Sequence, residues 1–208
     1  MADIVQSNLE QMLPDLHNFI ERDIFSRDEV TEIIQKRTNA EYKMIRKSLC
    51  LRHFREAIQY EAELEKLRES RQGDEGEKTK SDYSIVKRIT KIFDRAVSVF
   101  KDDVSLWKDY IGFALRAKRF QSLGKIIARG LLFHARNRDL WLIAFNTEKL
   151  IKNNWDSSRE VLQKAVKFLP KDKEIWLEYL KFEKEYAEKS DVEKIKNGDV
   201  LKIALKHA

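Results

Sequence analysis

Glycine and proline are scarce in this chain of 208 residues, which contains six Gly and two Pro. Average usage would be about 7% for Gly and about 5% for Pro. Strand boundaries and tight turns consume these residues, so their scarcity predicts an all-α chain with short connections. Charged residues make up 37% of the sequence, which fits helices that each bury one stripe and expose the rest.

Signatures of catalysis and metal binding are missing as well. The single cysteine, Cys50, excludes an internal disulfide and a cysteine-rich zinc site. No two histidines stand four residues apart, the glycines form no phosphate-binding loop, and no nucleophile motif is present. We therefore expect no enzymatic activity, no cofactor, no metal and no small-molecule substrate.

Long hydrophobic runs are absent too. The longest uninterrupted apolar run is Leu140 to Phe145, far shorter than a membrane span. The first residues, Met1 to Val5, lack the positive lead and apolar centre of a signal peptide. We expect a soluble intracellular protein without a membrane partner.

An internal repeat is the strongest positive feature of the sequence. Trp107, Trp141 and Trp176 are 34 and 35 residues apart. A second set of positions keeps the same intervals and carries a small residue each time: Ala96, Gly130 and Ala165. Such a period predicts antiparallel helix pairs that stack into a right-handed superhelical solenoid. We expect the tryptophans to lie in the core, where the small residues let the second helix of each pair approach closely.

A degenerate first copy of the repeat begins at Phe54, nineteen residues further from Trp107 than the period allows. The surplus corresponds to an apolar-free run, 70–82, which we predict to be an exposed loop. The predicted organisation is an N-terminal helical cap over 1–50 and a solenoid over 51–208. It has about three and a half to four repeats and stops mid-repeat at the C-terminus.

Local signals mark where several helices start. Ser26 and Glu29 form a capping-box pattern. Acidic residues before the tryptophan helices are expected to cap them: Asp102 or Asp103, then Asp139, then Asp172. Thr38-Asn39 suggests a break in the third helix.

Positive charge is concentrated in 104–154, which holds ten Lys or Arg against three acids, a net charge of +7. This excess predicts contact with RNA or another phosphate-rich partner through Lys118, Arg119, Lys125, Arg136 and Arg138. The alternative is a solvated helix face. Arg129 is the least suitable member, since its repeat position suggests an internal ion pair.

Trp155 lies off the period, in a turn before a helix. One interpretation is a hydrophobic staple against Arg159 or Leu162. The other is a partner-binding anchor.

The phrase W-x-x-Y-x-x-F-E, present from Trp176 to Glu183, and Phe93-Asp-Arg-Ala96 in the paired helix resemble the half-a-TPR (HAT) repeat family. Two copies depart from the pattern: Ala114 replaces the Glu of the second, and the third has Ala144 and Thr147 at the Tyr and Phe positions. HAT repeats occur mainly in RNA-processing assemblies, so the resemblance implies a scaffold rather than an enzyme.

The order of N-terminal features is similar to one HAT-repeat family, whose members are subunits of the small-subunit processome. These features are Leu13-Pro14, Phe25-Ser26, Glu41-Tyr42 and Tyr60-Glu61, followed by Lys101 to Trp107. The resemblance implies a nucleolar scaffold that acts in pre-rRNA processing and 18S rRNA maturation. Its implied partners are WD-repeat proteins of the same subcomplex, with small nucleolar RNA and pre-rRNA contacted directly or indirectly. The alternatives are a HAT-repeat scaffold in pre-mRNA splicing or 3′-end processing, and a direct RNA-binding protein.

Overall fold

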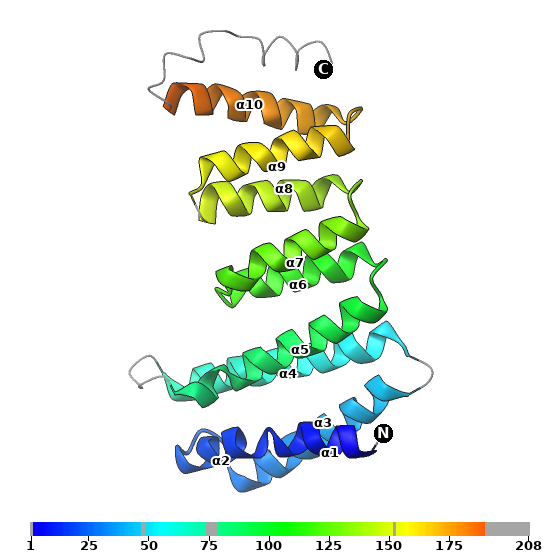
Figure 1. The fold of residues 1–208 in the computed structure, drawn as a ribbon. Helices are drawn as coiled ribbons and strands as arrows, with labels where there is room; N and C mark the ends of the chain where they lie inside the picture. Colours follow the sequence, from blue (N-terminus) through cyan, green and yellow to red (C-terminus); the bar gives the residue numbers. More distant parts are fainter. Residues whose placement is uncertain (1, 47–48, 74–78, 152, 190–208) are drawn as a thin grey trace. The chain divides into compact units, whose positions relative to one another are not determined.

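The computed structural model describes residues 2–46, 49–73, 79–151 and 153–189, and in these ranges every regular element is a helix (Figure 1). The all-α prediction is therefore confirmed. The chain divides into two compact units, Met1–Leu106 and Trp107–Ala208. The predicted cap and the first long helix pair thus belong to one compact unit, and the predicted boundary near residue 50 lies inside it.

Unit 1 contains the helices α1 (Ala2–Glu10), α2 (Leu13–Glu21), α3 (Arg27–Ile45), α4 (Leu51–Gln72), the short 3-10 helix η1 (Lys80–Tyr83) and α5 (Ser84–Val99). The helix α4 packs along α5 and also contacts α3. The core of unit 1 is aromatic and aliphatic. Phe54 is buried and meets Phe100 edge to face, with ring centroids 5.9 Å apart, and Ala96 is fully buried. This packing buries the apolar stripe of α5, which the sequence presents at helical spacing.

The helix starts in unit 1 follow from local chemistry. Pro14 lies in the first turn of α2, where its missing N–H leaves no bond unmade. The Ser26 hydroxyl accepts from the Glu29 amide at 3.2 Å and the Glu29 carboxylate accepts from the Ser26 amide at 2.8 Å, so the predicted capping box is present. The suggested break at Thr38-Asn39 is wrong, because α3 is continuous and the Thr38 hydroxyl donates to the Ile34 carbonyl within it.

The predicted exposed loop 70–82 is structured at both of its ends. Ser70 to Gln72 complete α4, and the segment after Thr79 forms η1, where Asp82 is buried. Residues 74–78 lie outside the described residues. The prediction of an exposed loop rested on composition alone. Burial of the Asp82 carboxylate is favourable only because arginines from other helices of the unit pair with it, and composition does not reveal such pairing.

Unit 2 contains most of α6 (Val104–Arg116), then α7 (Phe120–Phe133), α8 (Arg138–Asn146), the π-helical turn η2 (Thr147–Ile151), α9 (Trp155–Phe168) and α10 (Lys173–Lys189). Trp107 stacks on Phe133 of α7 and Trp141 stacks on Phe168 of α9, with ring centroids 6.1 and 5.6 Å apart. The same contact therefore recurs in successive helix pairs. The C-terminal residues 190–208, where the sequence predicts that the last repeat stops midway, lie outside the described residues.

The small repeat residues lie where the helices of a pair approach. An added Cβ on Gly130 would lie 3.4 Å from the Trp107 ring, and Ala165 is fully buried in the cluster that contains Trp141 and Trp176. The structure thus places all seven repeat positions in the interior: Phe54, Ala96, Trp107, Gly130, Trp141, Ala165 and Trp176.

Two of the three predicted acidic caps are correct. Asp103 accepts from the Leu106 amide, and Asp172 accepts from the Glu174 and Ile175 amides. Asp139 does not cap α8, because Asn137 occupies the cap position and accepts from the Leu140 amide. The Asp139 carboxylate instead accepts from Lys108 at 2.5 Å.

Candidate functional site

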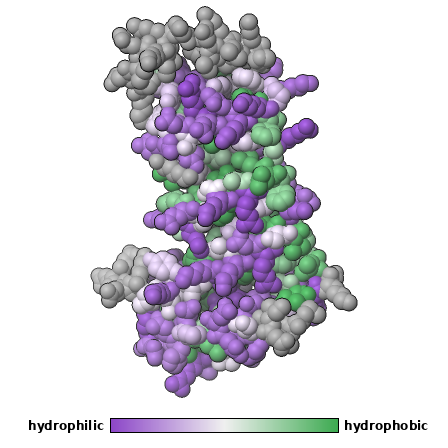
Figure 2. Space-filling view, in the orientation of Figure 1, coloured by the Kyte–Doolittle hydropathy of each residue, from purple (hydrophilic) through white to green (hydrophobic). Residues whose placement is uncertain are grey.

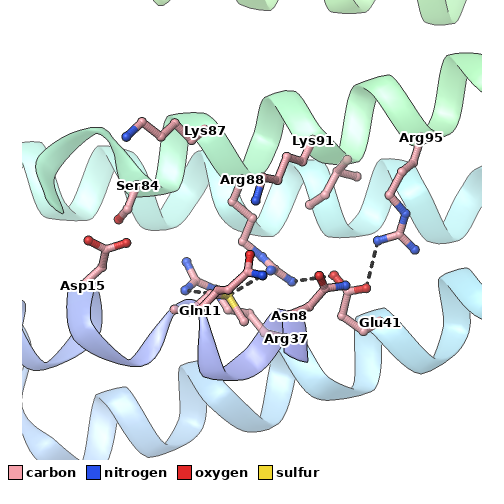
Figure 3. A pocket seen from close by; sticks show the side chains of 12 residues that line it. Asn8, Gln11, Asp15, Arg37, Glu41, Ser84, Lys87, Arg88, Lys91 and Arg95 are labelled. Atoms are coloured by element: carbon pink, nitrogen blue, oxygen red, sulfur yellow. Dashed lines mark hydrogen bonds and ion pairs between the residues drawn. The ribbon is translucent and has the colours of Figure 1, made fainter. Parts of the chain in front are cut away.

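A buried arginine–glutamate network joins α3, α4 and α5 of unit 1. Figure 3 shows the part of it that contains Arg37, Glu41, Arg88 and Arg95. Arg37 of α3 donates from Nε and Nη2 to the two carboxylate oxygens of Glu61 on α4, at 2.8 and 2.7 Å. The side chains are 4% and 2% exposed. Arg88 of α5 donates to the same carboxylate at 2.7 Å. Because each guanidinium donates directly to the Glu61 carboxylate, the charges of Arg37, Glu61 and Arg88 compensate one another away from solvent.

The network continues through Glu41 of α3, which is also buried. One oxygen of this carboxylate accepts from Arg88 at 3.1 Å, and the other accepts from Arg95 at 2.8 Å. Every carboxylate oxygen of Glu41 and Glu61 thus has an arginine donor. Three arginines face two glutamates, so the network carries one excess positive charge.

The same pairing occurs in unit 2. Arg159 of α9 donates from Nε and Nη2 to the two oxygens of Glu183 on α10, at 2.7 and 2.8 Å. In both units the arginine precedes the glutamate by 24 residues. Glu61 and Glu183 occupy the Glu position of the repeat phrase, so the Arg–Glu pair is a feature of the repeat. The central copies lack it, since Thr90 precedes Ala114 and Gly124 precedes Glu148 by the same interval.

Sequence reasoning missed this pair although the signal was present. The glutamate was recognised as part of the repeat phrase, but its partner stands in the preceding helix at a distance that no short motif covers. A search for arginine at a fixed interval before each repeat glutamate would have found both copies.

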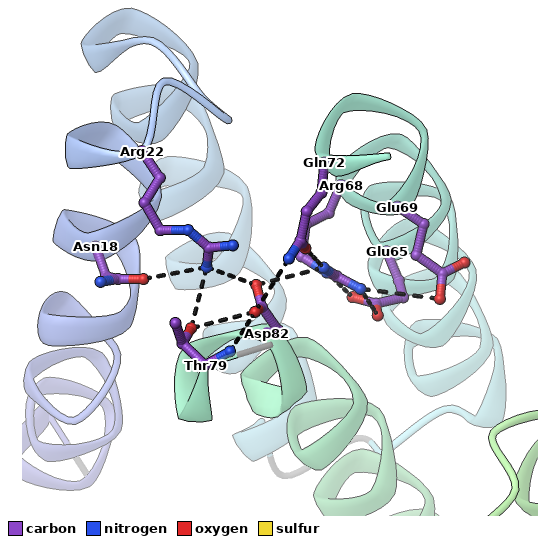
Figure 4. Close-up of polar contacts among 8 residues, drawn as sticks. All are labelled: Asn18, Arg22, Glu65, Arg68, Glu69, Gln72, Thr79 and Asp82. Atoms are coloured by element: carbon purple, nitrogen blue, oxygen red, sulfur yellow. Dashed lines mark hydrogen bonds and ion pairs between the residues drawn. The ribbon is translucent and has the colours of Figure 1, made fainter. Parts of the chain in front are cut away.

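A second polar cluster surrounds Asp82 of η1 (Figure 4). Arg22 from α2 donates to this carboxylate at 2.8 Å, and Arg68 from α4 approaches it at 3.4 Å. Burial by itself raises the pKa of the Asp82 carboxyl. Hydrogen bonds from Thr79, Arg22 and Gln72, together with the charge of Arg22, outweigh burial and lower the pKa below its ordinary value of 3.8. The cluster ties α2, α4 and η1 together.

The predicted basic contact residues do not form one patch. Lys118 and Arg119 lie in the turn before α7, Lys125 lies within α7, and Arg136 and Arg138 lie in the turn after α7 and at the start of α8. The two turns are separated by the 14 residues of α7, a length of about 20 Å. Lys118, Lys125 and Arg136 are exposed.

Arg138 is less available than its sequence context suggested. Its guanidinium lies 2.7 Å from Glu174 and 3.8 Å from Asp139. The charge count over 104–154 missed Glu174 because that residue lies outside the segment in sequence. The guanidinium of Arg129 lies 5.7 Å from the centroid of the buried Trp107 ring, which is a cation–π contact.

Trp155 is half-buried and packs inward. Its ring stacks on Phe182 of α10, with centroids 5.6 Å apart and an interplanar angle of 20°. The indole N–H donates to the Asn153 side chain, and Lys149 lies 5.5 Å above the ring. The core cluster that Trp155 packs against contains both Leu162 and Phe182, and its stacking partner is Phe182.

Apolar residues line a groove of about 460 Å³ formed by α7, α8 and α9 in unit 2. Its walls include Ile127 and Leu131 of α7, Trp141 of α8, and Val161 and Phe168 of α9. On the face shown in Figure 2, hydrophobic residues gather at the level of α7 and α8. Leu132, which also lines the groove, is 80% exposed, so unit 2 presents apolar surface to its surroundings.

Within the described ranges, no group of three or more His, Cys, Asp or Glu residues is arranged to hold a metal ion. No helix there combines the length and apolar character that a membrane crossing requires. Buried Arg–Glu pairs, recurring Trp–Phe stacks and an apolar groove define an all-helical protein with internal repeats.

Comparison with known proteins gives the particular family. Residues 9–88 match the family model described as "U3 small nucleolar RNA-associated protein 6". The chain is 36% identical over 192 residues to the protein of that name from Schizosaccharomyces pombe, and 33% identical over 197 residues to its homologue from Homo sapiens. These alignments cover 91% and 93% of the chain. The chain is therefore a homologue of U3 small nucleolar RNA-associated protein 6.

The chain spans 39% of the length of the Schizosaccharomyces pombe relative and 33% of the human one. The family-model match covers the segment that contains Arg37, Glu41, Glu61, Asp82 and Arg88. Apart from Arg95, the members of both polar clusters of unit 1 thus lie in the part of the chain that matches the family model.

Proposed function

We propose that this chain is part of a non-catalytic scaffold subunit of the small-subunit processome. In this role it supports pre-rRNA processing and maturation of 18S rRNA in the nucleolus. The observation that carries the proposal is the relationship to U3 small nucleolar RNA-associated protein 6 over more than nine tenths of the chain. The proposed partners are WD-repeat proteins of the same subcomplex, together with small nucleolar RNA and pre-rRNA.

The proposed architecture is a right-handed superhelical solenoid of HAT repeats over 51–208, with 1–50 as its cap. The recurring Trp–Phe stacks and the Arg–Glu pairs at a fixed interval support repetition of one structural unit. Exposed apolar side chains such as Leu132 and Leu150 support contacts with other proteins.

Affinity purification of the full-length protein from nuclear extract tests the proposal. Co-purifying proteins and RNAs are identified from the same sample. WD-repeat processome subunits together with U3 small nucleolar RNA are the expected result. Recovery of splicing or 3′-end processing factors in their place would refute the pathway while leaving the scaffold role intact.

The proposed RNA contact is auxiliary and runs through the basic part of unit 2. Residues 107–208 contain 22 Lys and Arg against 14 Asp and Glu, a net charge of +8, which favours contacts to a phosphate backbone. Arg136→Glu and Lys125→Glu are expected to weaken RNA association and flatten its salt dependence. Arg138→Glu gives the smaller effect, because Arg138 already pairs with Glu174. Unchanged RNA binding in all three variants would eliminate this contact.

A further inference from the structure

A cavity of about 180 Å³ opens beside the arginine–glutamate network of unit 1 (Figure 3). One wall is α5, and the facing wall is formed by α3 and by residues of α1, α2 and their junction. The lining is polar and includes Asn8, Gln11 and Ser84 beside the charged residues.

The α5 wall carries a stripe of positive charge. Lys87, Lys91 and Arg95 recur every four residues and line the cavity, with Arg88 beside them. Lys87 and Lys91 are exposed, and neither pairs with a carboxylate among the described residues. Arg95 donates from Nη1 to Glu41, and its Nε and Nη2 make no hydrogen bond among the described residues.

The acids near this stripe do not neutralise it. Both oxygens of Glu41 and both of Glu61 already accept hydrogen bonds from arginines. Among the described residues of the lining, Asp15 is the one remaining carboxylate. A ligand in the cavity therefore meets two unpaired lysines and spare guanidinium donors against one carboxylate, which selects for an anion.

The rest of unit 1 decides between RNA and protein as the source of that anion. Residues 1–106 contain 19 Lys and Arg against 21 Asp and Glu, a net charge of −2. A long polyanion such as RNA is not attracted by a unit whose net charge is negative. A few carboxylates interact mainly with charges within a Debye length, about 8 Å, so the basic residues of the cavity dominate their binding. The part of the lining that the structure describes also includes no aromatic residue on which a base could stack.

We propose that this cavity binds a short acidic peptide segment of a protein partner, with its carboxylates against Lys87, Lys91 and Arg95. The spacing of the stripe supports this, since four helical residues rise about 6 Å. Alternate side chains of an extended peptide are separated by about 6.6 Å, so acids at every second position match successive basic residues. Peptide binding by the cavity does not depend on the proposed function. Only the assumption that the peptide belongs to a partner in an assembly rests on the proposed scaffold role.

Fluorescence anisotropy tests the site directly. The probe is a fluorescein-labelled peptide of alternating Glu and Ser, titrated with the whole chain at about 0.15 M salt. The double variant Lys87→Gln/Lys91→Gln is expected to bind about 3–10-fold more weakly, as expected for loss of two partly solvated ion pairs. Asp15→Asn is expected to bind more tightly, because it removes the one competing carboxylate.

The matched control is Lys43→Gln/Lys66→Gln, which removes the same charge from exposed positions of unit 1 outside the cavity lining. Its affinity should stay within about twofold of the parent, since these charges are screened from the site. Equal weakening in both double variants would reduce the effect to net charge and overturn the proposal. So would the absence of peptide binding, or tighter binding of a single-stranded RNA oligonucleotide that the Lys87/Lys91 variant weakens.

These outcomes are independent of the purification experiment. Peptide binding with recovery of splicing factors would keep the site and reject the pathway. Recovery of processome subunits without peptide binding would keep the pathway and reject the site.

Discussion

Replacing Glu61 with glutamine would remove the negative charge at the centre of the unit 1 network while keeping the shape of the side chain. Arg37, 4% exposed, would lose its carboxylate partner, and Arg88 would keep only Glu41. Breaking a buried pair by removing one partner costs about 3–5 kcal/mol, because the remaining charge stays buried without compensation. This is a large part of the 5–15 kcal/mol typical of a whole domain.

The distribution of tryptophan makes the measurement specific to one unit. All four Trp residues lie at or beyond Trp107, so tryptophan fluorescence follows unit 2 while helical circular dichroism follows both units. Glu61→Gln should move the circular dichroism transition in urea to lower denaturant. The fluorescence transition should move less, and the difference between the two shifts measures how strongly the units are coupled.

Two comparisons give this prediction its control. Glu56→Gln on the same helix breaks the exposed pair with Arg52, whose side chains are 79% and 47% exposed, and should cost about 0.5 kcal/mol or less. The double variant Arg37→Met/Glu61→Leu should lose less stability than the two single variants added together, because it removes both charges of the pair. A cost below about 1 kcal/mol for Glu61→Gln, or additive losses in the double variant, would refute the reasoning.

Three further changes test other parts of the structure. Gly130→Ala should leave stability unchanged or raise it by up to about 1 kcal/mol, since the added Cβ meets Trp107 at an ordinary contact distance; Gly130→Leu should lower it by about 1–3 kcal/mol, and thermal melts decide. Asp82→Asn should destabilise unit 1 at neutral pH. Because the Asp82 pKa is lowered in the folded state, its contribution is present above its ordinary value of 3.8 and is lost as the pH falls through the folded pKa; parent and variant should therefore converge in acid, and a constant gap in urea midpoints would contradict this. Glu183→Gln should cost less than Glu61→Gln, because Arg159 is 26% exposed, and its effect should appear in the tryptophan fluorescence transition.

Helix content and core positions could be predicted from the sequence because they depend on local, periodic signals. Low Gly and Pro content, the capping box at Ser26 and the interval between tryptophans each report on interactions within or between neighbouring helices. Asn137 shows the limit of this reasoning. Asp139 looked suitable as a cap, but a cap side chain must lie just before the first turn, and a shift of two residues left Asp139 free to bind Lys108.

Apart from the Arg–Glu pairs at the 24-residue interval, the contacts of the polar clusters could not be predicted, because their members meet only after folding. Arg22 and Asp82 are 60 residues apart, and Arg37 and Arg88 reach the same carboxylate from different helices. Charge counting along the sequence failed for the same reason. The charge count over 104–154 left Arg138 without enough acidic partners, but the fold places its guanidinium 2.7 Å from Glu174. Lys87 and Lys91 lie in a unit of net negative charge, so counting charges along the sequence did not indicate the basic cavity that they line.

The Asp82 cluster also has a practical consequence. Arg22 of α2 and Arg68 of α4 contact this carboxylate through their side chains. An epitope or affinity tag inserted between Gly73 and Thr79 is expected to leave these contacts, and with them the fold of unit 1, in place. The tagged protein could then be captured without altering either end of the chain.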